Sequence, residues 1–254
     1  MTNDPAPLIR ARGLDKSFGE GAARTEVLHA IDLDIAEGEF LAIMGPSGSG
    51  KSTLLYCLSG LDAVTAGTVH IRGTEITALD QDHLAALRLR TMGFVFQQVH
   101  LLRNLTILDN IVLPGVTAMP KDRAAVVDRA RATLERVGIA DLAERDITAA
   151  SGGQLQRAAI ARALVNRPAI VFGDEPTGAL NATTAVETMD LLAEVNAEGR
   201  TVVVVTHDPN VAARAGRVVV LRDGRIDGDL RRAAQEQDDG WRSRLDAWLL
   251  GAGI

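Results

Sequence analysis

Residues 45–53 read GPSGSGKST, and residues 40–44 directly before them read FLAIM. Glycines this closely spaced give up side-chain packing and cost backbone entropy, so they indicate a geometric requirement. One interpretation is a flexible turn that contains a lysine. The other is a loop that binds phosphate groups, and the rest of the sequence decides between the two.

The surroundings of the loop favour phosphate binding. It satisfies G-x-x-x-x-G-K-[ST], with an apolar strand before it and a helical pattern after it. In such a loop, backbone N–H groups converge on phosphate oxygens and the following helix adds the positive end of its dipole. Lys51 is expected to reach the β- and γ-phosphates, and the Ser52 hydroxyl to ligate Mg²⁺. The predicted nucleotide-binding residues are Gly45, Pro46, Ser47, Gly48, Ser49, Gly50, Lys51, Ser52 and Thr53.

Composition limits the class of protein. The 254 residues are 46% apolar and carry a formal net charge of −6, which suits a globular protein and argues against a dedicated nucleic-acid-binding domain. The single cysteine, Cys57, excludes an intrachain disulfide and is expected on a packed helix face. The first residues lack the pattern of a signal peptide, and no apolar run approaches the ~18 residues that span a bilayer. We therefore expect a soluble chain that reaches a membrane only through a partner.

Strands and helices alternate along much of the sequence, which predicts an α/β fold with a largely parallel sheet. Residues from about 98 to 165 read almost entirely helical and predict an inserted helical subdomain. Two helical patterns end at Gly138 and Gly199, which are placed as C-caps. The predicted strands are 40–45, 93–97, 169–175, 201–207 and 217–226.

The C-terminal segment carries an apolar stripe on one helical face, for which packing against a core or a subunit is the usual explanation and a membrane-surface role the less favoured one. The stripe consists of Trp241, Leu245, Trp248 and Leu249.

Two acidic residues end another apolar run. Residues 169–175 read AIVFGDE, so Asp174 and Glu175 lie at the carboxyl end of a predicted buried strand, where α/β proteins bind ligands. Asp174 is placed to hold Mg²⁺ through a bound water, and Glu175 to orient or deprotonate the attacking water. A solvated strand end is the alternative for a single acid. Two acids downstream of a phosphate loop favour a catalytic site.

The run ASGGQLQR at 150–157 has no obvious folding reason. Together with the phosphate loop, it resembles the signature motif of ABC-transporter ATPases, usually written L-S-G-G-Q. Gln97 resembles the Q-loop glutamine of that family, and His207 resembles its switch histidine. Phe18 matches the aromatic residue that stacks on adenine, and EPTGALN after Glu175 resembles the D-loop.

The resemblance covers nearly all of residues 8–228. It implies a P-loop NTPase core with an inserted helical subdomain and an N-terminal antiparallel β region. It also implies a head-to-tail homodimer in which ATP lies between the P-loop of one chain and the signature motif of the other. The predicted domains are an ABC ATPase domain at 1–228 and a C-terminal helical tail at 229–254.

The resemblance also implies roles for individual residues. Glu175, His207 and Gln97 are the predicted catalytic residues. Ser52, Gln97 and Asp174 are the predicted Mg²⁺ ligands. The signature residues that would contact ATP from the facing chain are Ser151, Gly152, Gly153 and Gln154.

Two positions depart from the family pattern. Ala150 replaces the usual Leu, which we expect to be tolerated because Ser151 and the two glycines supply the phosphate contacts. Asn181 replaces the usual D-loop Asp and keeps a hydrogen-bonding oxygen without the charge, so communication between paired sites is expected to change. Neither departure touches the metal-binding or water-activating positions, so an active ATPase is predicted.

GPSGSGKST, FVFQQVHLL, DEPTGAL and VVVVTHD together resemble one branch of the family. That branch contains lipoprotein-release, macrolide-export and antimicrobial-peptide-export ATPases, and a cell-division relative. The run GALN most resembles the antimicrobial-peptide exporters. A separately encoded integral membrane permease is implied, which would hold the chain at the cytoplasmic face of the cell membrane as a peripheral subunit.

Three functional classes compete. The first is an ATPase that powers a membrane export or extraction complex. The second is a regulatory ATPase whose membrane partner transmits force and moves no substrate. The third, a soluble ABC ATPase acting on DNA or ribosomes, is disfavoured by the acidic charge and by the single cassette without long insertions, so no nucleic-acid partner is expected.

Overall fold

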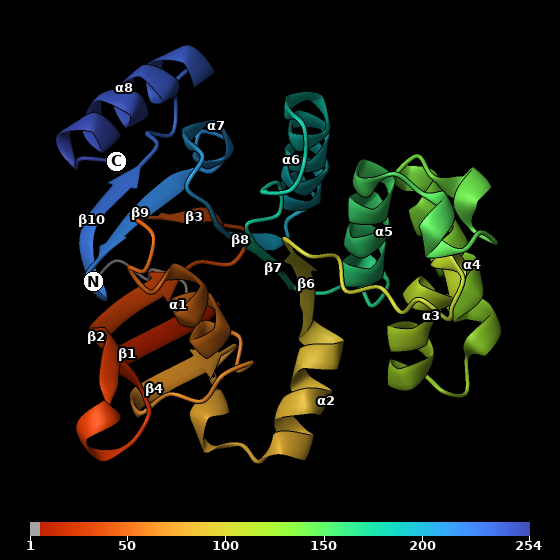
Figure 1. Ribbon diagram of the computed structural model, residues 1–254, viewed down its shortest axis with the longest axis horizontal. Helices are drawn as coiled ribbons and strands as arrows, with labels where there is room; N and C mark the ends of the chain where they lie inside the picture. The colour runs from red at the N-terminus through yellow and green to blue at the C-terminus, as the bar shows by residue number, and fades with distance from the viewer. Residues whose placement is uncertain (1–5) are drawn as a thin grey trace. The chain divides into compact units, whose positions relative to one another are not determined.

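The structure is a computed structural model that describes residues 6–254, except for the side chain of Ala22. The chain forms two compact units. One contains the residues up to Asp80 together with Thr201–Ile254, and the other contains Gln81–Arg200. Figure 1 shows the helices and strands of both units and labels most of them.

The first unit holds an antiparallel sheet near the N-terminus. Its strands lie in the order β2-β1-β4-β5, and every neighbouring pair is antiparallel. This sheet is the antiparallel β region that the family resemblance implies. Its elements are β1 (Ile9–Phe18), β2 (Thr25–Ile35), β4 (Ala66–Ile71) and β5 (Thr74–Glu75), with 3₁₀ turns at Gly21–Ala23 and Ile76–Ala78.

A second sheet of this unit leads into the phosphate loop. β3 is parallel to β8 and to β9, and β9 pairs antiparallel with β10. Every residue of β3 and β8 is buried, as expected for parallel strands that are covered on both faces. The elements are β3 (Phe40–Met44), α1 (Lys51–Leu58), β8 (Thr201–Val205), α7 (Pro209–Ala212), β9 (Arg217–Arg222), β10 (Arg225–Arg231) and α8 (Asp238–Gly251).

Cys57 lies on the packed face of α1, as predicted. Burial raises the pKa of its thiol to about 12, and the negative charge of Asp62 acts in the same direction. The thiolate, which is the reactive form, is therefore scarce at neutral pH.

The second unit combines a parallel strand pair with helices. β6 and β7 pair in register from Met92 and Ile170 to Phe96 and Asp174. The helices α3, α4 and α5 pack on one another in the stretch predicted to be a helical subdomain. The elements are α2 (Gln81–Thr91), β6 (Met92–Phe96), α3 (Ile107–Ala118), α4 (Arg123–Arg136), α5 (Gly152–Leu164), β7 (Ile170–Asp174) and α6 (Ala182–Ala197), with 3₁₀ turns at Ala140–Leu142 and Ile147–Ala149.

The predicted strand at 217–226 is wrong, because the structure forms a hairpin there. β9 ends at Arg222 and β10 begins at Arg225. The two residues between them, Asp223 and Gly224, have φ values of 46° and 70°. Positive φ at both positions is the geometry of a type I′ turn, for which Asp-Gly is a preferred sequence. The other four predicted strands are confirmed, each ending within two residues of its expected bounds.

The C-terminal helix α8 lies beside β9, β10 and α7 (Figure 1). Trp241, Leu245 and Leu249 are buried, which confirms the packing role predicted for this face. Trp248 lies over Gly228 of β10, where an added Cβ would be 2.6 Å from the indole ring. Among residues 6–254, no helix combines the length and the apolar character needed to cross a membrane.

Candidate functional site

The predicted site residues are divided between the two units. The first unit contains the phosphate loop, Phe18 and His207, and the second contains Gln97, the two acids after β7 and the signature motif.

The phosphate loop joins the end of β3 to the start of α1, and two of its glycines are required by close neighbours. Gly45 has a φ of 148°, and an added Cβ would lie 2.0 Å from the carbonyl oxygen of Leu221. Gly50 has a φ of 97°, and an added Cβ would lie 2.9 Å from the Leu28 side chain. Side chains at these positions would displace the surrounding strands, so the loop is a packed structure and not a flexible turn.

Neighbouring strands and the loop's own lysine fix its shape. The backbone N–H of Gly224, in the β9–β10 turn, donates to the carbonyl oxygen of Ser49 at 3.2 Å. The N–H of His29 in β2 donates in turn to Gly224 at 2.9 Å. Lys51 Nζ donates to the carbonyl oxygens of Gly45 and Pro46, both at 2.9 Å, which places the ammonium group across the loop.

The start of α1 has the chemistry of an anion site. Gly50 is its N-cap and, having no side chain, does not cap the positive end of the helix dipole. Ser49 Oγ is buried and has no hydrogen-bond partner within the part of the chain that the structure describes. A phosphate group accepts hydrogen bonds from backbone N–H groups, hydroxyls and ammonium groups alike. The residues from Gly45 to Thr53 therefore fit a phosphate ligand.

Phe18 ends β1 with 46% of its surface exposed. Lys16 Nζ lies 4.5 Å from the centroid of its ring, a cation–π contact. The same ammonium donates to Asp62 Oδ1 and to the carbonyl oxygen of Ala63, both at 2.7 Å. Lys16 thus ties the strand of Phe18 to the segment after α1, while much of the aromatic surface stays accessible for stacking.

His207 follows β8 at the sheet edge where the phosphate loop begins. Val205 pairs with Ile43 of β3, and the N–H of Thr206 donates to the Ile43 carbonyl oxygen at 3.1 Å. Because β3 and β8 are parallel, Gly45 and His207 both follow the carboxyl ends of neighbouring strands. The first unit therefore brings the phosphate loop and the exposed His207 to one edge.

The second unit places Gln97 and Glu175 in the same way. Phe96 pairs with Asp174, so the next residue on each parallel strand leaves the same edge. The Gln97 side chain lies over Gly178, where an added Cβ would be 2.9 Å from Nε2. Glu175 has a φ of 48°, in a region that residues with a side chain seldom adopt. Such strain persists where the surrounding structure imposes it, and it clusters at functional sites.

The signature residues open α5 with a complete capping box. Ser151 Oγ accepts the N–H of Gln154 at 3.4 Å, and Gln154 Oε1 accepts the N–H of Ser151 at 2.8 Å. Both side chains act as acceptors in the box, so the hydroxyl proton of Ser151 and the amide protons of Gln154 can be donated to another acceptor. An added Cβ at Gly152 would meet nothing within 4 Å, whereas one at Gly153 would lie 2.4 Å from Thr184 Cγ2.

Gln156 is a site residue that the sequence analysis missed. It is 2% exposed, and its Nε2 donates to the carbonyl oxygens of Pro176 at 2.7 Å and Phe96 at 3.3 Å. It therefore ties the signature helix to the residue before Gln97 and to the residue after Glu175. The available signal was periodicity, because Gln156 lies on the helical face of the apolar residues Ala159, Ile160 and Ala163.

Asn181 has a local structural role as the N-cap of α6, where its Oδ1 accepts the N–H of Thr184 at 3.0 Å. Asn and Asp are comparable N-caps, so Asn181 performs this role as well as the usual aspartate would.

Comparisons with known proteins agree with this geometry. The ABC transporter family model matches residues 28–178. A macrolide export ATP-binding/permease protein, MacB 1/2 of Paracoccus denitrificans, is 48% identical over 241 residues, which are 94% of this chain and 36% of the relative. The lipoprotein-releasing system ATP-binding protein LolD 2 of Rhodospirillum rubrum is 48% identical over 223 residues, 87% of this chain and 96% of the relative. The chain thus spans about a third of the MacB relative and nearly all of the LolD relative.

Solved structures agree with the fold. The dimeric structure of MJ0796, a bacterial ABC transporter cassette, matches with a TM-score of 0.82 and 40% identity over 89% of this chain and 99% of that chain. A dimeric post-hydrolysis state of MJ0796 bound to ADP and Pi matches over the same shares, with a TM-score of 0.80 and 38% identity. The α/β ATPase fold predicted from the motifs is confirmed, and this chain belongs to the ABC transporter family as one of its ATP-binding cassettes.

Proposed function

We propose that this chain is the ATP-binding and ATP-hydrolysing subunit of a membrane export or extraction complex, which it powers through ATP-driven closure of a homodimer. The observation that carries the proposal is the pair of helix starts described above. α1 begins at a packed glycine loop without a side-chain cap, and α5 begins at a capping box with protons to donate. The similarity to the macrolide export protein MacB, to the lipoprotein-releasing protein LolD and to the dimeric MJ0796 cassette supports it.

Each predicted binding residue has a role in this proposal. The loop backbone and Lys51 bind the β- and γ-phosphates, and Phe18 stacks on adenine. Ser151, Gly152 and Gln154 of a second copy bind the γ-phosphate from the other side. Because each site then needs groups from two chains, hydrolysis depends on dimer closure, and loss of phosphate reopens the dimer.

Hydrolysis needs a base and a metal ion. Ser52, Gln97 and Asp174 would hold Mg²⁺, since their hydroxyl, amide and carboxylate oxygens are the hard ligands that this ion prefers. The ion, when bound, offsets negative charge on the β- and γ-phosphates. Glu175 accepts a proton from the attacking water, a role that suits a carboxylate held on a strained backbone. His207 contacts the γ-phosphate and senses its presence.

The second unit offers a docking surface for a permease. A cavity of about 520 Å³ is lined by residues 97–101, Arg103 and the start of α5, among others. Arg162 holds this segment by donating to the carbonyl oxygens of His100 at 2.6 Å and Val99 at 2.9 Å. Leu102 beside it is 48% exposed. We assign this surface to a cytoplasmic segment of a separately encoded permease, which would make the chain a peripheral subunit at the membrane.

The proposal is tested with the purified chain, alone and co-reconstituted with its permease. Alone, it should be mostly monomeric without ATP and hydrolyse slowly, and the permease should raise the rate. Leu102→Glu should remove that stimulation and leave basal turnover unchanged. The matched control is Leu250→Glu, which changes an exposed leucine on α8 and should keep the stimulation. Fast, non-cooperative turnover by a monomer would contradict the composite site.

The second candidate is a regulatory ATPase whose membrane partner transmits force without moving a substrate. Both candidates share the site chemistry, so substrate accumulation or drug-sensitivity assays are needed to separate them. Antimicrobial-peptide export, which rests on the GALN run, stays a prediction. Asn181 is the N-cap of α6, and this structural role explains an asparagine at the position without reference to any substrate.

A further inference from the structure

We propose that the C-terminal helix α8 is a positioning device for His207. Trp241 and Arg242 would hold the short helix α7, which begins two residues after the histidine, and through it fix the histidine toward the γ-phosphate. This inference rests on the proposed role of His207 as the group that senses that phosphate.

A continuous chain of hydrogen bonds runs from α8 to the residues on either side of His207. The guanidinium of Arg242 donates to Asn210 Oδ1. The N–H and the side-chain amide of Asn210 donate to Asp208 Oδ1 at 2.8 and 2.9 Å. The N–H of Asp208 donates to Thr206 Oγ1 at 2.9 Å. His207 therefore lies inside a turn whose outer end is held by α8.

A second bond holds the other end of α7. Trp241 is 1% exposed, and its Nε1 donates to the carbonyl oxygen of Ala213, the C-cap residue of α7, at 3.1 Å. α7 is a four-residue helix, and helices this short have little stability of their own. Burial of Val211 and Ala212 holds the middle of α7, and the bonds to Asn210 and Ala213 hold its two ends.

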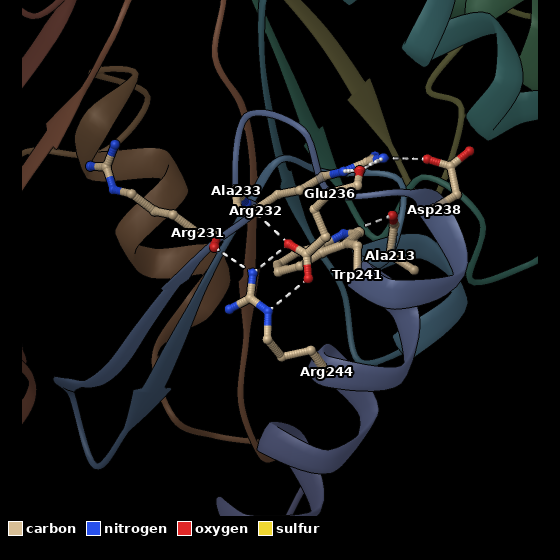
Figure 2. A network of polar contacts seen from close by, with 8 residues as sticks. All are labelled: Ala213, Arg231, Arg232, Ala233, Glu236, Asp238, Trp241 and Arg244. Atoms are coloured by element: carbon tan, nitrogen blue, oxygen red, sulfur yellow. Dashed lines mark hydrogen bonds and ion pairs between the residues drawn. The ribbon is translucent and has the colours of Figure 1, made fainter.

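The N-terminal part of α8 is itself anchored by a polar network (Figure 2). The Glu236 carboxylate accepts hydrogen bonds from Arg244 Nε at 2.8 Å and Nη2 at 2.6 Å, and from the N–H of Ala233 at 3.0 Å. Arg244 also donates to the carbonyl oxygen of Arg231, the last residue of β10, at 2.8 Å. Its guanidinium carbon lies 5.1 Å from the centroid of the Trp241 ring. The network therefore holds the indole and the helix start on the end of β10.

The hydrogen bonds of this network also affect the ionisation of Glu236. The hydrogen bond from Arg244, followed by that from Ala233, lowers the pKa of Glu236 to about 2. The carboxylate thus stays ionised through the pH range in which the protein would work, and the anchor stays formed.

Simple burial of apolar surface does not account for these contacts. Leu245, Trp248 and Leu249 pack toward the sheet, which is enough to cover it. The two side chains at the N-terminal part of α8, Trp241 and Arg242, also direct hydrogen-bond donors at α7. Burial of the indole by itself requires an acceptor for Trp241 Nε1, but burial does not require the bond from Arg242, whose side chain is 47% exposed.

The test measures how strongly the full-length chain prefers a nucleotide with a γ-phosphate. The readout is the Kd for ADP divided by the Kd for the non-hydrolysable analogue adenylyl imidodiphosphate, both measured by calorimetry with Mg²⁺. Trp241→Phe keeps the buried ring and removes the donor. Arg242→Met removes the charge from a side chain that is 47% exposed, so folding should be retained. Each should lower the ratio about three- to tenfold, the size expected for one lost hydrogen bond, without changing the Kd for ADP.

Matched variants separate positioning from general loosening. Trp248→Phe makes the same change on the same helix, away from α7, and should keep the wild-type ratio. Arg242→Lys keeps a charged donor and should restore most of it. His207→Ala should lower the ratio, and adding Arg242→Met to it should lower it no further, because both changes act through the same group. Thermal unfolding of each variant checks that the fold is intact.

The outcomes distinguish this inference from the proposed function. If His207→Ala lowers the ratio but Trp241→Phe and Arg242→Met do not, α8 does not position the histidine. If Arg242→Met lowers the ratio equally with and without His207, its effect has another route and the inference is overturned. If His207→Ala leaves the ratio unchanged, the proposed role of His207 fails, and this inference fails with it.

Discussion

Two helices of this chain begin at glycine-rich motifs, and they begin in different ways. α1 has Gly50 as its N-cap and no side-chain hydrogen bond, whereas α5 has Ser151 and a complete capping box. At α1 neighbouring strands leave no room for side chains at the loop glycines. At α5 the backbone N–H groups of the helix start are bonded by side chains of the helix itself.

The difference indicates how each helix start would meet a phosphate. The shape of the loop before α1 is fixed by β2, β9 and Lys51, and Gly50 has no side-chain cap that a ligand would have to displace. The start of α5 is stable by itself and offers only the protons that its capping box does not use. We infer that the first start binds nucleotide in the single chain, and that the second adds its contacts when a second copy closes.

The largest expected effect tests whether both starts bind one nucleotide. Glu175→Gln removes the proposed base and should slow hydrolysis by about 10²–10⁴-fold while ATP and Mg²⁺ still bind. An ATP-bound dimer should then accumulate, which size-exclusion chromatography with Mg·ATP would detect. Adding Lys51→Ala should dissociate it. A variant that hydrolyses ATP at the wild-type rate would show that Glu175 is not the base, and one that binds ATP as a monomer would show that closure needs the membrane partner.

The two signature glycines should separate into one required by packing and one required by the ligand. Gly153→Ala places a Cβ 2.4 Å from Thr184 Cγ2 and should lower the free energy of unfolding by about 1–3 kcal/mol. Thr184→Ser removes that methyl group and should restore most of the stability. Gly152→Ala meets no neighbour, so its stability should be unchanged while ATP-dependent dimerisation weakens. Denaturant unfolding measures the first two effects, and equal losses in both alanine variants would contradict the distinction.

Phe18→Ala tests nucleotide binding at the α1 helix start only, without any contribution from the α5 start of a second copy. Loss of stacking on adenine should weaken ATP binding by about 1–3 kcal/mol. The fold should be retained, because the Phe18 ring is exposed and contributes little to the core. Phe18→Tyr keeps the aromatic face and serves as the control. Stacking uses few base-edge contacts, so ATP and GTP should bind with similar affinity. Calorimetry gives the dissociation constants, and an unchanged value for Phe18→Ala would remove this residue from the site.

The smallest expected effect separates capping from phosphate binding at α5. Ser151→Ala removes the N-cap and should cost about 1 kcal/mol of stability. Ser151→Asp keeps a capping oxygen and should retain that stability, but it places a negative charge where the phosphate would bind. If capping were the only role of Ser151, the aspartate variant would dimerise with ATP as the wild type does.

Residues whose geometry is local were predictable from the sequence. GPSGSGKST specifies its loop because the glycine spacing and the preceding strand leave few alternatives, and Gly138 and Gly199 directly follow the C-caps of α4 and α6 with positive φ. The hairpin at Asp223 and Gly224 was also predictable in principle. It was missed because 217–226 was treated as one apolar run and Asp223-Gly224 was not taken as a turn.

Features that depend on distant segments were not predictable. Gln156 bonds to carbonyl groups 60 and 20 positions away in the sequence. The left-handed backbone of Glu175 is likewise imposed by its surroundings, since glutamate has no preference for it. The contact between Trp241 and Ala213 required knowing that α8 packs beside α7, which an apolar stripe alone does not specify.

The β9–β10 turn has a consequence for protein engineering. Two-residue hairpin turns at a surface are common sites for inserting an epitope tag or a fluorescent reporter. At Gly224 such an insertion would break the bond to Ser49 and displace the phosphate loop, so the reporter would destroy the activity it was meant to follow. The turn between β4 and β5 is the better choice, because an added Cβ at Gly73 meets nothing within 4 Å.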